Sequence, residues 1–129
     1  MKIFSVLCLL IVASFSNLKP SYAQGTIEDQ YKQMGGIVAL AQMCLSSNKL
    51  EKVLFQKIAE ALYSNPDSGR DINNALNLYF ESYDIAKQKK VIWNGTLQSY
   101  SAVPFTCDNK DKEVIENFET RFIQGLQSS

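Results

Sequence analysis

The chain has no histidine and only three cysteines, and these two scarcities exclude many kinds of active site. Without histidine there can be no Ser-His-Asp or Cys-His catalytic group and no histidine-containing metal site. Too few cysteines remain for a four-thiolate zinc site once Cys8, in the apolar N-terminal block, is set aside. Carboxylate, tyrosine or lysine catalysis stays open on composition alone. We expect a protein that is not an enzyme and needs no metal or other cofactor.

The sequence also lacks an apolar run long enough to cross a bilayer as a helix. The longest such run, Ile3 to Phe15, follows Lys2 and is too short for a membrane span. A polar stretch ending in Ser21-Tyr22-Ala23 comes next, with small residues at the third and first positions before a possible cut. This pattern predicts a cleavable signal peptide over residues 1–23, with Gln24 as the new N-terminus. The alternative is a buried N-terminal helix.

The predicted mature chain, residues 24–129, has room for one domain and carries little net charge. The whole chain has 13 basic and 13 acidic residues; Lys2 and Lys19 leave with the signal, so about 11 basic residues face 13 acidic ones. A net charge near −2 argues against nucleic acid or an anionic membrane as the main partner. We expect a soluble exported protein, periplasmic or extracellular, without stable membrane insertion.

Two cysteines, Cys44 and Cys107, remain after cleavage. An even pair in a protein bound for an oxidising compartment usually closes on itself, which predicts a Cys44–Cys107 disulfide. The alternative is a free or redox-active thiol. The long spacing lacks the Cys-x-x-Cys arrangement that favours rapid thiol exchange.

Apolar residues at helical spacing predict an all-α domain of four helices, closed by one disulfide. The first helix follows Thr26, a predicted N-cap with Asp29 in the capping-box position, and the second follows Asn48 and ends at Asn65-Pro66. Gly35-Gly36 lies inside the first helix, and it predicts either a close approach of another backbone or a kink. The four expected apolar faces run from Ile27 to Leu45, from Leu50 to Leu62, from Ile72 to Ala86 and from Ile115 to Leu126.

The helical signal weakens between Val91 and Thr106. Asn94-Gly95 is a typical hairpin turn, so we expect an irregular segment with hairpin character; a frayed helical continuation is the alternative. The triplet Asn94-Gly95-Thr96 also fits a glycosylation sequon, which matters only in a eukaryotic source.

Trp93 and Tyr100 are the predicted binding residues, because they give large contact areas with a polar tip and lie off the regular helix faces. Core filling is the commoner role for such residues. Glu81 and Asp84 share a helix face and could form an acid/base pair, but solvated surface charges are the simpler interpretation.

The order of helix, Cys44, helix, Asn65-Pro66 turn, helix and Cys107 resembles small disulfide-bonded periplasmic immunity proteins that neutralise cell-wall amidase toxins. The resemblance covers about half of the mature chain, and the interval from Ile85 to Thr106 departs from it, so no toxin-binding residue is carried over.

We therefore expect a helical protein that binds another macromolecule, most simply another protein, as a secretion-accessory or envelope interaction protein. The resemblance gives one alternative, an immunity or inhibitor protein against an exported toxin. A carrier of a small apolar ligand is the other. A carrier should contain a large internal apolar cavity, whereas a binding module should have a solid core and an exposed aromatic patch.

Overall fold

A computed structural model describes residues 26–128 of the chain. The predicted signal peptide and Cys8 lie outside this range. The elements in chain order are α2 (Ile27–Leu45), α3 (Lys49–Ser64), the short 3₁₀ turn η2 (Pro66–Ser68), α4 (Gly69–Lys89), β1 (Trp93–Asn94), β2 (Ser99–Tyr100) and α5 (Asn109–Gln127). The predicted all-α fold with a hairpin before the last helix is confirmed. Over residues 26–128, no helix is both long and apolar enough to cross a membrane.

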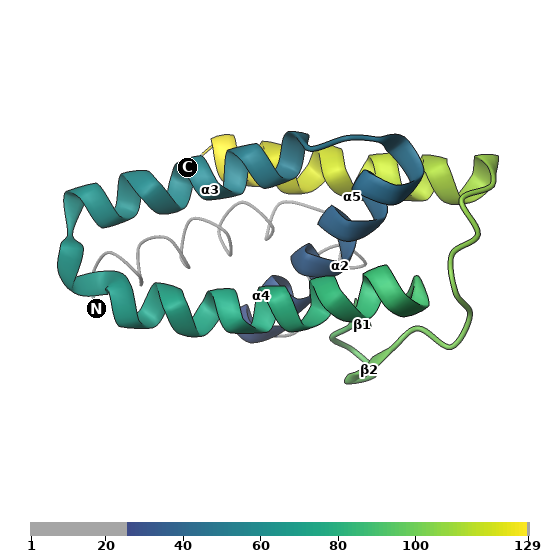
Figure 1. Ribbon diagram of the computed structural model, residues 1–129, viewed down its shortest axis with the longest axis horizontal. Coiled ribbons are helices and arrows are strands. Elements are labelled where there is room, and N and C mark those ends of the chain that lie inside the picture. Colours follow the sequence, from purple (N-terminus) through teal and green to yellow (C-terminus); the bar gives the residue numbers. More distant parts are fainter. Residues whose placement is uncertain (1–25, 129) are drawn as a thin grey trace.

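Helix α2 is the centre of the structure. In Figure 1, α3 and α5 lie along one long side, α4 lies along the opposite side, and α2 crosses between them. Every residue of α2 from Asp29 to Ala41 is buried except Lys32. The sequence predicted one apolar face for this helix. It is covered on nearly all sides because α4, α5 and β1 all pack against it.

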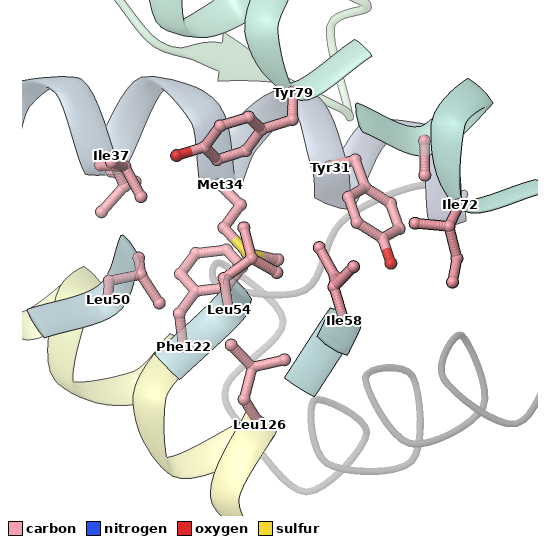
Figure 2. Packing of buried hydrophobic residues seen from close by; sticks show 12 residues of the cluster. Tyr31, Met34, Ile37, Leu50, Leu54, Ile58, Ile72, Tyr79, Phe122 and Leu126 are labelled. Carbon is pink, nitrogen blue, oxygen red and sulfur yellow. The ribbon is translucent and has the colours of Figure 1, made fainter. Parts of the chain in front are cut away.

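The main core is formed by side chains from all four helices (Figure 2). Tyr79 of α4 is fully buried and points its hydroxyl into this core, so burial, reinforced by the negative charge of Glu51, raises the pKa of Tyr79 well above its usual range. The largest fully buried side chains are Tyr31, Met34, Ile37, Leu40, Leu50, Leu54, Tyr79, Ile115, Phe122 and Leu126. They fill the space between the helices.

The two glycines of α2 mark the predicted close approach. A Cβ built on Gly35 would lie 2.1 Å from the backbone oxygen of Tyr79, and one on Gly36 would lie 3.1 Å from Cγ2 of Ile92. The Ser82 hydroxyl donates to the backbone oxygen of Lys32 across the same contact. Helices α2 and α4 therefore touch backbone to backbone at Gly35, as a glycine allows, while Gly36 faces Ile92 after α4.

The N-caps of α2 and α5 form side-chain cap bonds, whereas the predicted cap of α3 does not. Thr26 caps α2 in a complete capping box with Asp29, and the Asp108 side chain accepts from the backbone N–H of Asp111 at 2.7 Å. Asn48 holds the N-cap position of α3, but the cap bond predicted for its side chain is not formed. Its backbone lacks the extended geometry of a usual N-cap. The Ser47 hydroxyl instead accepts from the Lys49 N–H at 3.4 Å.

Cys44 and Cys107 form the predicted disulfide, with their α-carbons 5.2 Å apart. The bridge joins the last turn of α2 to the residue before the N-cap of α5. A second small cluster, centred on Leu40, Ala41 and Ile115, packs beside Cys44. This end of the molecule is thus closed by both covalent and apolar contacts.

Candidate functional site

The hairpin after α4 forms the two-stranded sheet of the described chain, and its turn is well organised. Strands β1 and β2 pair antiparallel, with Trp93 opposite Tyr100 and Asn94 opposite Ser99. The Asn94 Oδ1 atom accepts backbone N–H bonds from Thr96 at 2.9 Å and Leu97 at 3.0 Å. An asparagine side chain that bonds the backbone ahead of it in this way stabilises a turn.

Asp29, in the first turn of α2, fastens this hairpin to the helices. Its carboxylate accepts from the indole Nε1 of Trp93 at 2.8 Å and from Nε2 of Gln98 at 3.1 Å. It also accepts the backbone N–H of Thr26 at 2.8 Å, as the capping box requires. Gln98 has a positive φ of 53°, an uncommon conformation for this residue type. Gln98 Nε2 donates to both carboxylate oxygens of Asp29, and these bonds offset the free-energy cost of that backbone conformation.

Asp29 is buried, yet the pKa of its carboxyl is lowered and the ionised form is favoured. Burial alone would raise the pKa of its carboxyl, but the hydrogen bonds donated by Thr26, Trp93 and Gln98 outweigh burial and hold the pKa below its usual value. The ionised form of Asp29 is therefore the one that binds the hairpin to α2.

The structure brings Trp93 and Tyr100 together, and both are half-buried. Their rings meet edge to face with centroids 5.0 Å apart, and the Lys32 ammonium lies 4.1 Å from the centre of the Trp93 ring. Burial, with the negative charge of Glu81 as a second cause, raises the pKa of Tyr100. The two rings thus pack against each other within the hairpin, and their direct part in binding stays a prediction.

An open groove of about 600 Å³ lies between the hairpin, the segment after it, α2 and α5. Two aliphatic side chains on its rim are strongly exposed, Leu97 at 71% and Val103 at 77%. The groove is lined by Gln33, Ile92, Trp93, Asn94, Gly95, Thr96, Leu97, Ser101, Val103, Phe105 and Phe118. Hereafter "the groove" means this set of residues.

The groove can offer apolar contact and amide or hydroxyl hydrogen bonds. None of its lining residues has an ionisable side chain, so no general acid or base faces into it. Among residues 26–128, no three His, Cys, Asp or Glu side chains come together as metal ligands. Glu81 and Asp84, the pair considered for acid/base chemistry, are both exposed on α4.

Sequence reasoning missed Asp29, Leu97 and Val103 as parts of this site. Asp29 was recognisable as a capping residue, but its bonds to Trp93 and Gln98 span 64 and 69 residues. Leu97 and Val103 carried a readable signal, since they are large aliphatic residues in a segment without helical periodicity.

No family model matches this sequence, and searches of curated proteins and of solved structures give no significant match. The argument for function therefore starts from the groove.

Replacing Asp29 with asparagine is expected to cost about 1.5 to 3 kcal/mol at neutral pH, as for hydrogen bonds to a charged group. Because the folded-state pKa of Asp29 is lowered, its contribution is present above the unfolded pKa and is lost as pH falls through the folded pKa. The gap in unfolding free energy between wild type and Asp29→Asn should therefore shrink in acid. Urea titrations followed by the fluorescence of Trp93, the single tryptophan, measure it.

Asp84→Asn is the matched control for this comparison, since Asp84 is exposed on α4. Its stability should stay within about 0.5 kcal/mol of wild type at every pH, as for most surface changes. An Asp29→Asn gap that is equally large at neutral and acid pH would contradict the assignment.

Proposed function

We propose that this chain is an exported protein that binds another protein through the groove. The observation that carries the proposal is the pair of exposed aliphatic side chains, Leu97 and Val103, on the rim of a groove with no ionisable lining. Apolar surface gathered in this way, beside half-buried aromatic residues, is typical of protein-binding sites. Trp93 lines the groove and the Tyr100 ring packs edge to face against it, so both stay in the proposed surface.

Rigid presentation also supports binding by the hairpin. The bonds from Trp93 and Gln98 to Asp29 hold it on α2 before any partner arrives. A preformed binding loop loses less conformational entropy on association than a flexible one. Binding residues are often found on such loops above a rigid scaffold.

Export is the second part of the proposal. The disulfide between Cys44 and Cys107 fits an oxidising compartment, and the Ser21-Tyr22-Ala23 pattern fits removal of a signal peptide. The resemblance to immunity proteins supplies one class of partner to test first, an exported toxin.

Binding of a protein is better supported than transport of a small apolar ligand. A carrier needs an enclosed apolar cavity, whereas large side chains such as Tyr31, Met34 and Phe122 pack together in the core (Figure 2), and the hollow between α2 and α4 is open to solvent. The groove is open to solvent and fits a protruding side chain of a partner.

Photo-crosslinking in the native host tests the proposal. A photoreactive residue in place of Leu97 should capture one dominant protein, because Leu97 stands on the rim of the groove. The matched control is the same residue in place of Tyr63, which is 91% exposed. Tyr63 belongs to the last turn of α3, at the opposite end of the molecule from the hairpin (Figure 1).

The captured protein is then titrated with purified variants. Leu97→Ala and Val103→Ala should each weaken binding by more than about 1 kcal/mol, while Tyr63→Ala should leave it unchanged. Equal capture from positions 63 and 97, or unchanged affinity in both groove variants, overturns the proposal.

A further inference from the structure

The turn of the hairpin contains the only Asn-Gly pair of the sequence, Asn94-Gly95. Asn94 is exposed, and its side-chain oxygen receives the N–H bonds of Thr96 and Leu97 at 2.9 and 3.0 Å. In the described part of the chain, the Gly95 N–H donates to no other residue. The electrophilic Cγ of Asn94 is thus next in the chain to the backbone nitrogen of Gly95, and the N–H of Gly95 makes no hydrogen bond within the described residues.

We propose that Asn94 is a self-modification site, at which the folded hairpin promotes conversion of the side-chain amide into aspartate and isoaspartate. The proposal concerns the chemistry of the turn and stands apart from the partner-binding function.

The reaction needs only water. The backbone nitrogen of Gly95 gives its proton to solvent and attacks Cγ of Asn94, forming a C–N bond and a tetrahedral oxyanion at Oδ1. The bond from Cγ to Nδ2 then breaks, and the side-chain nitrogen takes a proton from water and leaves as ammonia. The resulting succinimide is opened by one water molecule at either carbonyl, which gives aspartate or isoaspartate. No group is oxidised or reduced.

The fold favours attack on Cγ because the backbone N–H groups of Thr96 and Leu97 both point at Oδ1 of Asn94. Negative charge develops on Oδ1 as the nitrogen attacks, and two N–H donors are already aimed at that atom. Preorganised donors at a developing oxyanion lower the barrier of a reaction, as in the oxyanion holes of hydrolases. Gly95 adds no Cβ beside the attacking nitrogen. The turn therefore combines an accessible nucleophile with a stabilised oxyanion.

The other asparagines of the described chain lack this combination. Asn65 precedes Pro66, which has no N–H to lose. Asn48 precedes Lys49, whose N–H donates to the Ser47 hydroxyl at 3.4 Å. Asn73, Asn74, Asn77, Asn109 and Asn117 lie within helices, where the following residues have helical backbone geometry. Asn94 should accordingly be modified first.

Modification changes the groove. Asn94 lines it, so either product places a carboxylate among residues that carry no ionisable side chain. Isoaspartate also adds a methylene to the backbone where Asn94 pairs with Ser99. If the proposed function holds, partner binding weakens as the protein ages; the modification itself does not depend on that function.

The test compares the disulfide-bonded protein, residues 24–129, with a synthetic peptide of residues 91–101 at neutral pH and physiological temperature. Peptide mapping by mass spectrometry follows the amide-to-acid mass change, and chromatography separates the isoaspartyl product. The rate at Asn94 in the folded protein should equal or exceed the peptide rate, and exceed that of any other asparagine at least about tenfold. A folded-state rate below the peptide rate overturns the proposal.

A pair of variants tests the role of the N–H donors. Thr96→Pro removes the donor at 2.9 Å, whereas Thr96→Ala keeps it. Modification should slow in the proline variant and stay at the wild-type rate in the alanine variant, with Trp93 fluorescence reporting that the hairpin is intact. Leu97→Pro and Leu97→Ala provide the same comparison at the second donor if Thr96→Pro disturbs the turn. Equal rates in a folded proline variant and its alanine partner overturn the oxyanion argument.

Discussion

Gly35→Ala is expected to destabilise the protein by at least about 2 kcal/mol, within the upper range of overpacking in a filled core. Inside a helix, alanine is favoured over glycine by about 1 kcal/mol, so helix propensity alone predicts stabilisation. The new Cβ would lie 2.1 Å from the backbone oxygen of Tyr79, however, and that atom belongs to the α4 backbone. Helices α2 and α4 would have to separate. Urea unfolding followed by circular dichroism measures the loss.

Two other glycines are the controls for this substitution. Gly69 begins α4, and a Cβ there would meet nothing closer than Cδ2 of Leu62 at 4.0 Å, so Gly69→Ala should be neutral or stabilising by up to about 1 kcal/mol. Gly36→Ala would press on the Ile92 side chain at 3.1 Å and should fall between the two. If Gly35→Ala unfolds at the same urea concentration as wild type, the backbone contact does not limit stability.

The sequence predicted the helices well because their signals are local. A run such as Ile72 to Ala86 shows its apolar face through spacing alone, and this face packs against α2 in the structure. The glycine pair was also readable, since a helix interior rarely keeps two glycines without a packing reason. The disulfide followed from counting the cysteines that remain after the predicted cleavage.

The candidate site could be predicted only in part, because its decisive contacts join distant segments. The hairpin was expected from Asn94-Gly95, but nothing near Asp29 shows that its carboxylate accepts a bond from Trp93. The Lys32 ammonium that lies over the Trp93 ring also comes from α2, far from Trp93 in the sequence. Local sequence patterns predict which helix or strand carries a side chain. Predicting its contacts with distant residues requires knowing how all the elements pack together.

Asp29 and Asn94 have opposite expected effects on the groove. Asp29 holds the base of the hairpin by charge-assisted hydrogen bonds, while Asn94 at its tip lies in the geometry proposed to promote loss of its own amide. The first stabilises the groove, and the second limits how long the groove keeps its original chemistry. Measuring both on one preparation separates loss of fold from change of surface.

Removing the disulfide is expected to have the largest effect on stability. Cys44 and Cys107 lie 63 positions apart, and closing a loop of this length stabilises a fold by about 4 kcal/mol in the chain-entropy model. Small domains have only about 5 to 15 kcal/mol in total. The double variant Cys44→Ala/Cys107→Ala should therefore melt roughly 15 to 30 °C lower, by the usual relation between free energy and melting temperature in small domains.

Reduction of the wild type provides the first control, because it breaks the disulfide without substituting any residue. A reducing agent should lower the wild-type melting temperature to near that of the double variant and leave the variant unaffected. A double variant that melts within a few degrees of the oxidised wild type would show that the bridge adds little to the apolar cluster around Leu40 and Ile115.

The backbone at Cys107 allows a sharper version of the same experiment. Cys107 has a φ of 62°, in the left-handed region that costs a non-glycine residue about 1 to 2 kcal/mol. In the oxidised protein the bridge to Cys44 holds this conformation, and the chain then enters the Asp108 cap of α5.

Once the bridge is gone, glycine fits position 107 better than alanine does. Cys44→Ala/Cys107→Gly should therefore be more stable than Cys44→Ala/Cys107→Ala by about 1 kcal/mol in urea unfolding. If the alanine variant is the more stable of the two, residue 107 leaves the left-handed conformation when the bridge is removed, and α5 then starts without the geometry that the disulfide imposes.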